Sequence, residues 1–352
     1  MRRTNGLVAT ATVASLSLSL VVGVDKAAAQ KPVVSETKPI EISARPITGF
    51  DKQNTDRQQF GRLRWRGGLE LSSTSREFGG LSGLVLDDDG RRLLAVSDAG
   101  AWLMAELTYK GTQPAHVRRA WIGPLRTRDG DPLTRSRDRD AEAVTLANGS
   151  LDNGLALIAF EGNHRIGWFR ITEAGPSAPL HYLENPREAR RMASNQGFEA
   201  VSVLRGGPFK GSIIAFAERL EDERGHHTGW LWVEGKPQKL HLVDIGGFDI
   251  TDAASLDDGG LLVLERRFRW TEGVRMRLRL IRPDELSPGA VMQGEVLFEA
   301  DMAYEIDNME GVAVHRGPHG ETVVSLISDN NFNPMLQRTL LLQFTLKEAR
   351  ED

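Results

Sequence analysis

Five segments of the chain repeat one pattern of apolar and polar positions. Each opens with a short run of small and apolar residues, passes a turn rich in Gly, Asp or Asn, and continues in an apolar run that ends at an acid. Two apolar runs joined by such a turn are typical of a β-hairpin. The opening runs are 82–86, 142–146, 199–203, 252–256 and 310–314. Repetition at 53 to 60 residues indicates a repeat architecture.

Further strands complete these units. Third strands are predicted at 102–107, 166–171, 230–233, 274–281 and 340–346, and several of them alternate polar and apolar residues as half-buried strands do. Fourth strands are predicted at 117–121, 180–183, 240–243 and 296–299. The fifth unit has no fourth strand before the chain ends, whereas segment 63–71 precedes the first unit without a place in it. We therefore expect this N-terminal strand to complete the last unit and close a ring.

The pattern predicts an all-β fold, a β-propeller of four-stranded blades. The innermost strands consist of small residues, as required where blades crowd near the propeller axis. Five repeats are visible, and a sixth blade is possible if the N-terminal segment contributes more. The alternative is a β-sandwich whose turns recur by coincidence.

The N-terminus has the features of a secretory signal. Arg2 and Arg3 precede an apolar stretch at 7–24, and Ala27-Ala28-Ala29 offers a cleavage site. We expect residues 1–29 to be removed and the protein to be periplasmic or secreted, with no membrane contact after cleavage. A retained anchor is the alternative, and the twin-arginine and general export routes both stay open.

Composition narrows the class of protein further. Without cysteine, the fold can hold no disulfide or thiolate-bound metal. The net charge of −4, more negative after signal removal, argues against nucleic-acid binding. We expect a monomer with a loose arm at 30–58, a propeller domain at 59–347 and a tail at 348–352.

Acids recur at the strand ends that meet at one end of each hairpin. The start of the first strand and the end of the second lie together because the two strands are antiparallel. First strands begin at or near Glu142, Glu199, Asp252 and Glu310, and second strands end at Asp98, Glu161, Glu218, Glu265 and Asp329. Asp140 could join them, since alternate residues of an extended segment face one side. We therefore expect an acidic mouth on one face of the propeller.

So many carboxylates cannot all stay ionised without cations, and oxygen ligands at this density suit calcium. The candidate metal ligands are Asp98, Asp140, Glu142, Glu161, Glu199, Glu218, Glu310 and Asp329. The alternative is a scaffold in which the acids accept backbone hydrogen bonds from the next blade or pair with arginines.

Basic residues follow several of these acids. Arg165, Arg219 and Arg266 are candidates for binding a phosphate ester through charge-assisted contacts, although surface salt bridges would explain them too. His164, Glu142 and Glu199 are the candidate catalytic residues. With no cysteine and no Ser-His-Asp signature, covalent acyl transfer has no support in the sequence.

Four short motifs resemble those of the bacterial phytase-like family, also called esterase-like phytase proteins. They are 140–143, 197–200, 307–311 and the closing run 328–334 with 337–339. The resemblance covers about residues 60 to 346. It implies a secreted or periplasmic propeller with phosphomonoesterase activity on inositol phosphates. Better-characterised propeller phytases use several Ca²⁺ ions to bridge carboxylates and substrate phosphates, but none of their individual catalytic residues can be matched to this chain.

Three functions follow as hypotheses. The first is a calcium-dependent phosphoric-ester hydrolase that acts on a small phosphorylated substrate at the acidic mouth. The second is a non-catalytic propeller, stabilised by calcium, that binds a ligand or a protein. The third is a lactonase-type hydrolase with one central calcium ion and a histidine base.

Overall fold

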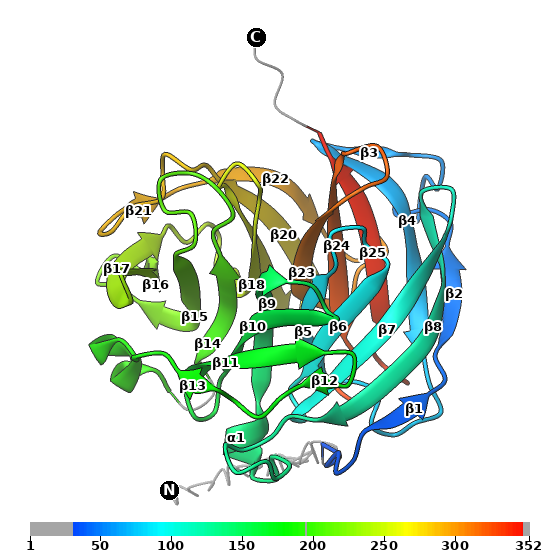
Figure 1. Cartoon of the computed structure of the whole chain (residues 1–352). Helices are drawn as coiled ribbons and strands as arrows, with labels where there is room; N and C mark the ends of the chain where they lie inside the picture. The colour runs from blue at the N-terminus through cyan, green and yellow to red at the C-terminus, as the bar shows by residue number, and fades with distance from the viewer. Residues whose placement is uncertain (1–30, 194–195, 348–352) are drawn as a thin grey trace, which may run out of the picture. The chain divides into compact units, whose positions relative to one another are not determined.

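The strands are grouped in five sheets, each built around one of the five sequence repeats (Figure 1). The computed structural model describes residues 31–193 and 196–347. The predicted signal sequence and the tail therefore lie outside the described residues. Within these residues, no helix combines the length and apolar character needed to cross a membrane.

Each blade is an antiparallel sheet that begins at the centre of the propeller. Blade 1 contains β5 (Leu81–Leu86), β6 (Arg92–Ser97), β7 (Ala101–Lys110) and β8 (Gln113–Pro124). Blade 2 contains β9 (Ala141–Gly149), β10 (Asn153–Phe160), β11 (Arg165–Thr172) and the edge pieces β12 (Gly175–Pro176) and β13 (His181–Tyr182). Blade 3 contains β14 (Phe198–Val203), β15 (Ile213–Glu221), β16 (His227–Val233) and β17 (Lys236–Leu242), which pairs with the short parallel strand β21 (Val291–Met292).

The last two blades follow the same plan. Blade 4 contains β18 (Asp249–Ser255), β19 (Leu261–Arg269), β20 (Gly273–Ile281) and β22 (Glu295–Ala300). Blade 5 contains β23 (Asn308–Arg316), β24 (Thr322–Asp329), β25 (Thr339–Leu346) and β4 (Leu63–Ser72). Two short helical turns, α1 (Ser136–Arg139) and η1 (Arg187–Arg191), lead into the inner strands of blades 2 and 3.

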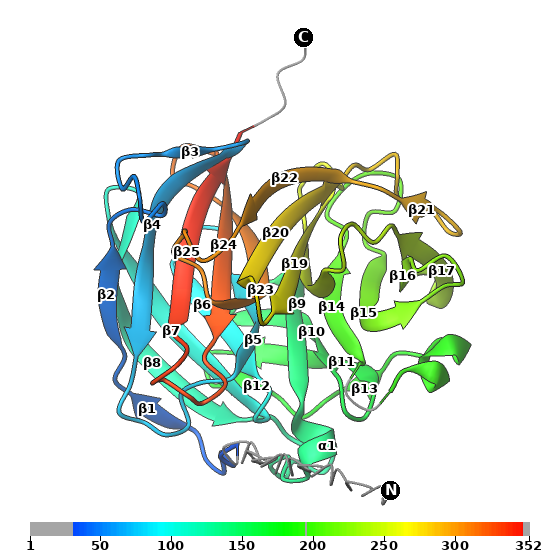
Figure 2. The same ribbon diagram turned by 180° about the vertical axis from the view of Figure 1, so that it is seen from behind.

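The inner strands form a closed ring. They pack in the order β5, β9, β14, β18 and β23, and β23 packs on β5 again. Figure 2 shows β23, β5, β9 and β14 near the centre of the molecule. Small residues allow this crowding: a Cβ atom on Gly83 of β5 would lie 2.7 Å from the backbone nitrogen of Val144 in β9. The predicted fold class, a β-propeller, is therefore confirmed, and the described residues form five blades.

A strand from the N-terminal part of the chain pairs with the last described strand in blade 5. Strand β4 pairs antiparallel with β25, in a register that runs from Leu63 opposite Leu346 to Leu71 opposite Thr339. These pairs bury leucines of both strands in the cores on either side of the blade. An N-terminal segment thus supplies the outer strand of the last repeat.

The segment 31–58 differs from the loose arm that the sequence predicted. β1 (Lys38–Ile40) pairs with β8, and β2 (Ser43–Ile47) pairs with β4, to which β3 (Gln59–Phe60) also adds. Phe50 is fully buried against the ring of Trp65, and Val34 is 2% exposed. A few isolated apolar anchors and backbone pairing hold this segment, and neither produces the periodic pattern by which a strand is recognised in sequence.

Candidate metal centre

One end of every inner hairpin contains a β-bulge. At this end, one residue of the first strand has no partner on the second strand, and this bulge position is Ser82, Glu142, Glu199, Thr251 and Glu310 in blades 1 to 5. A bulge breaks the alternation of a strand and re-aims the side chain of the extra residue. Three of the five bulge positions hold glutamate.

A second set of residues lies at or near the end of each second strand, opposite the residue two positions before the bulge. This strand-end position is Asp98, Glu161, Glu218, Arg266 and Asp329 in blades 1 to 5. In blades 1 to 3 its backbone N–H donates to the carbonyl of Gly80, Asp140 or Gly197, at 2.9, 2.8 and 3.0 Å. The backbone therefore repeats although the side chains vary.

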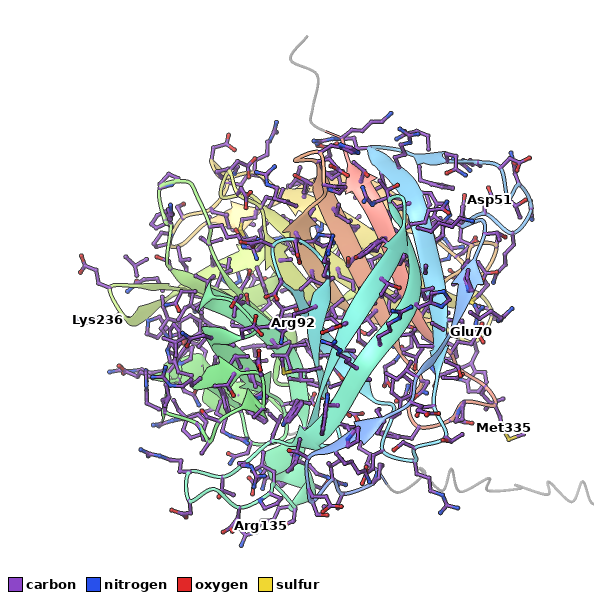
Figure 3. The ribbon with its side chains drawn as sticks, turned by 45° about the vertical axis from the view of Figure 1, so that its right-hand side comes forward. Asp51, Glu70, Arg92, Arg135, Lys236 and Met335 are labelled. Atoms are coloured by element: carbon purple, nitrogen blue, oxygen red, sulfur yellow. The ribbon has the colours of Figure 1, made fainter. Side chains whose placement is uncertain are left out.

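The eight acids predicted as metal ligands are the seven carboxylates at these two positions together with Asp140. These carboxylates lie close enough to interact electrostatically. The pKa of Glu199 is raised by the charges of Glu142, Glu161, Glu218 and Glu310, and that of Asp329 by Asp98 and Glu310. Figure 3 shows this end of the blades, where Arg135 and Met335 lie, with Asp51 at the opposite end. The structure thus brings the eight predicted acids to one mouth of the propeller.

Two acids of blade 4 do not join this group, because the bulge there falls at Thr251, one residue earlier than the repeat alignment placed it. Asp252 is 1% exposed and accepts hydrogen bonds from the backbone nitrogens of Val312 and Ala253, both at 2.8 Å. Glu265 is fully buried and paired with Arg279. A slip of one residue sends a side chain to the other face of a strand, so both acids are scaffold.

Asp140 reaches the mouth by a different local structure from the one expected. The residues before it form the single turn α1, and the segment is not extended. Asp138, which would have alternated with Asp140, instead accepts a hydrogen bond from Asn163 Nδ2 at 3.1 Å. Asp140 follows the helical turn directly and precedes β9.

Two overlapping groups of carboxylates have the spacing of a cation site. One is Asp140, Glu142 and Glu161, and the other is Glu161, Glu199 and Glu218; within each group one oxygen per residue lies within 4.8 Å of the others. Calcium binds oxygens at 2.3–2.6 Å, so ligands on opposite sides of one ion lie about 5 Å apart. The carboxylates of blades 2 and 3 therefore fit a divalent cation such as calcium, and Glu161 belongs to both groups.

Burial changes the protonation of these groups. It raises the pKa of Glu161 to about 7, with help from the charge of Asp140, and raises the pKa of Glu218 to about 7 although Arg219 opposes the shift. Burial and neighbouring carboxylates raise the pKa of Glu142 and Glu199 well above the ordinary value. Without a bound cation, these raised pKa values favour the protonated form of the carboxylates.

The protein supplies some positive charge itself. Lys31 Nζ lies 2.9 Å from Asp98 Oδ2 and 3.0 Å from Asp140 Oδ1. Arg266 Nε lies 3.3 Å from Glu310 Oε1. Within the described residues, no lysine, arginine or histidine makes an ion pair with Glu142, Glu161 or Glu199. Charge in the mouth is thus compensated at Asp98, Asp140, Glu218 and Glu310 and left uncompensated at these three glutamates.

Of the three candidate phosphate-binding arginines, two lie at the acids. Arg266 occupies the strand-end position of blade 4, and Arg219 is 3.5 Å from Glu218 while it holds Asp249 through two hydrogen bonds of 2.9 and 2.5 Å. Arg165 instead donates to the backbone carbonyls of Asn163 and Asp138 and stacks on the Phe160 ring. Its guanidinium therefore holds the loop around α1.

His164 lies beside the second carboxylate group. A Cβ atom on Gly197 would be 2.5 Å from His164 Nδ1 and 2.8 Å from the Cα atom of Glu161, so Gly197 allows the imidazole to pack next to this acid. Among the described residues, His164 Nδ1 is buried without a hydrogen-bond partner. His164 thus lies beside one of the predicted acids, whereas the sequence gave no sign of Lys31.

Solved propellers give only distant similarities, and a search of the curated proteins finds no match. The Dos1 propeller is 7% identical with a TM-score of 0.37, covering 82% of this chain and 76% of that one. The Cps50 (Swd1) β-propeller domain of Myceliophteria thermophila is 10% identical (TM-score 0.39; 88% and 100%), and Raptor of Chaetomium thermophilum is 11% identical (TM-score 0.35; 90% and 24%). Similarities of this size do not bear on function.

The comparison with protein families gives a clear result. The phytase-like family, described as esterase-like activity of phytase, matches residues 76–332. This range contains the bulge and strand-end positions of all five blades, but neither Lys31 nor β4. The chain belongs to the phytase-like family.

Proposed function

We propose that the protein is an exported, calcium-dependent phosphoric-ester hydrolase that acts on a small phosphorylated substrate at the acidic mouth. The observation that carries the proposal is the pair of overlapping carboxylate groups in blades 2 and 3, which share Glu161. In the described part of the chain, Glu142, Glu161 and Glu199 have no ion-pair partner. Membership of the phytase-like family supports the choice of phosphate esters. The apolar segment before the Ala27-Ala28-Ala29 motif supports export.

The acidic residues of the mouth suit the metal ion, and the basic residues suit the substrate phosphate. Asp140, Glu142, Glu161, Glu199 and Glu218 would hold calcium, since they offer hard oxygen ligands at suitable spacing. When bound, the ion supplies Lewis-acid polarisation of a phosphoryl oxygen and lowers the pKa of a water molecule.

Arg266 suits the substrate phosphate. Its guanidinium reaches the mouth from blade 4, and its Nε atom makes an ion pair with Glu310 without a hydrogen bond of good geometry. A planar guanidinium can hold a phosphate by two parallel hydrogen bonds. Arg219 at the neighbouring blade adds positive charge, although Asp249 already engages it.

The raised pKa values give two carboxylates a further role. Glu142 and Glu199 bind protons more readily than ordinary glutamates because they are buried among other acids. A carboxylate of this kind could take the proton of the attacking water or return one to the leaving oxygen. Both residues stand at bulge positions and belong to the carboxylate groups themselves, so this role requires a carboxylate oxygen that does not ligate calcium.

The test combines metal content with turnover. Purified mature protein should bind calcium and release phosphate from phytate or a simple phosphomonoester, and a chelator should abolish the release. Glu161→Gln should lose both properties because it removes a charge from both carboxylate groups. Glu106→Gln, which alters an exposed salt bridge to Arg119, is the matched control. Calcium-independent release, or full activity of E161Q, would overturn the proposal.

A second candidate is a calcium-stabilised binding propeller without catalysis. The compensated charges at blades 1 and 4 favour it, because Lys31 and Arg266 already turn part of the mouth into ion-paired scaffold. In that case calcium raises the melting temperature of the mature protein while neither phosphate esters nor lactones are turned over. Turnover of a lactone alone would instead support the third hypothesis, a lactonase.

A further inference from the structure

We propose that Lys31 is a built-in cation of the mouth, which occupies the subsite formed by Asp98 and Asp140 and thereby confines a divalent cation to the carboxylates of blades 2 and 3. The inference deepens the proposed function and rests on it for the premise that the mouth binds calcium. It assigns the N-terminal segment a part in deciding how many ions the mouth takes.

The contacts of Lys31 define the subsite. Its Nζ atom bridges two blades, at 2.9 Å from Asp98 Oδ2 and 3.0 Å from Asp140 Oδ1. Asp98 is 6% exposed, and its second oxygen, Oδ1, is buried without a hydrogen-bond partner among the described residues. The lysine thus satisfies one oxygen of this carboxylate and leaves a ligand atom available. Because this subsite already binds an ammonium group and has one further buried carboxylate oxygen, it could bind a metal cation in place of Lys31.

Hydrogen bonds and an apolar contact fix the main chain around Lys31. Arg139 of α1 is 7% exposed and donates to the carbonyls of Pro32 and Lys31, at 2.8 and 3.0 Å. Three residues further, Val34 packs against Ala101 and Ile122 of blade 1. The ammonium group is therefore delivered to the mouth by an anchored segment.

The position of Lys31 decides which carboxylates remain for a metal. Asp140 belongs to the group with Glu142 and Glu161, so an ammonium on Asp140 weakens that group as a divalent site by repulsion. The group of Glu161, Glu199 and Glu218 shares no residue with the Lys31 subsite. The wild-type mouth should therefore take its first calcium ion between blades 2 and 3.

Lys31→Met removes the charge while keeping much of the side-chain length. Titration calorimetry of metal-free mature protein with calcium chloride, using a C-terminal tag so that the N-terminus is native, should show either an additional equivalent of calcium or affinity about tenfold higher in K31M. Lys38→Met is the matched control, since Lys38 lies in the same segment but pairs with Glu77, at 2.7 Å. K38M should bind calcium like the wild type.

Lys31→Arg and melting temperatures show whether a change in K31M comes from the lost charge or from a folding defect. K31R keeps the positive charge and should restore wild-type calcium binding. Metal-free K31M should melt at a lower temperature than the wild type, because Asp98 and Asp140 lose their cation, and calcium should raise its melting temperature more than that of the wild type.

The outcomes separate this inference from the proposed function. Equal calcium binding by K31M and wild type, together with calcium-dependent phosphate release, would overturn the role of Lys31 and leave the proposed function standing. Stronger binding by K31M without phosphate release from any variant would support Lys31 and overturn the hydrolase. If neither protein binds calcium, both are overturned.

Discussion

Blades 3 and 4 use the same backbone with opposite charge. In blade 3 the bulge and strand-end positions hold Glu199 and Glu218, whereas in blade 4 they hold Thr251 and Arg266. Blade 4 also has acids nearby in sequence, but they serve the scaffold. The comparison teaches that the place of an acid relative to the bulge, rather than its presence near a strand end, separates a candidate ligand from a structural carboxylate.

Removal of Glu265 should have the largest effect, and it tests whether this acid is a structural carboxylate. Glu265→Ala leaves the fully buried guanidinium of Arg279 without its carboxylate partner, and we expect a loss of about 3–5 kcal/mol in unfolding free energy. Denaturant unfolding without metal measures it. A loss below about 1 kcal/mol, typical of an exposed ion pair, would contradict the scaffold role.

Unlike Glu265, the ionised acids of the mouth should destabilise the metal-free fold. The unfolding free energy should therefore depend on pH. Burial raises the pKa of Glu161 and Glu218 to about 7 in the folded protein. Below about pH 4.5 both states are protonated, and between about 4.5 and 7 only the folded state keeps these protons. The contribution of each of these two groups to the unfolding free energy of metal-free protein should therefore fall by about 3 kcal/mol as pH rises through this window.

Saturating calcium is the control for this pH dependence. The ion takes the place of the protons, so stability in calcium should no longer fall as pH rises from about 4.5 to about 7. Melting temperatures at several pH values, with calcium and with chelator, show the difference. Identical pH profiles under both conditions would mean that the acids do not hold the ion.

A smaller loss is expected at Asp252. Asp252→Ala leaves the backbone N–H groups of Val312 and Ala253 without their acceptor in a buried place, which should cost about 1–3 kcal/mol. Calcium binding should remain that of the wild type, because Asp252 is not a residue of the carboxylate groups. A loss of calcium affinity in D252A at constant stability would place Asp252 in the mouth after all.

The smallest effect on stability belongs to Glu199→Gln. This change removes one charge from a set of repelling carboxylates, so metal-free stability should stay the same or rise by about 1 kcal/mol, while calcium affinity falls. Calorimetry and denaturant unfolding of one sample report both quantities. Destabilisation by several kcal/mol would assign Glu199 to the scaffold and make blade 3 equivalent to blade 4.

The repeats made the propeller and most of the mouth predictable. In blades 2, 3 and 5 the bulge and strand-end acids keep the same separation, 142 to 161, 199 to 218 and 310 to 329, so the alignment found them. In blade 4 the corresponding positions are 251 and 266, and no pattern of apolar residues shows where a bulge falls. The alignment therefore chose the wrong phase by one residue.

Lys31 could not be found in this way. It lies 67 residues before Asp98 and outside the repeats, in a polar segment whose place on the surface depends on a few contacts such as Val34 with Ala101. Contacts between distant parts of a chain leave no local pattern. The contacts of Arg165 could not be predicted for a related reason, since its backbone acceptors belong to a loop whose shape the sequence does not reveal.

The pairing of β4 with β25 has a consequence for the order in which the molecule is made. β4 is among the first parts of the propeller to leave the ribosome and β25 among the last, and about 270 residues separate them. Until β25 arrives, β4 lacks its neighbour and blade 5 cannot assemble. A nascent chain therefore cannot complete its ring until nearly all of the propeller has been synthesised.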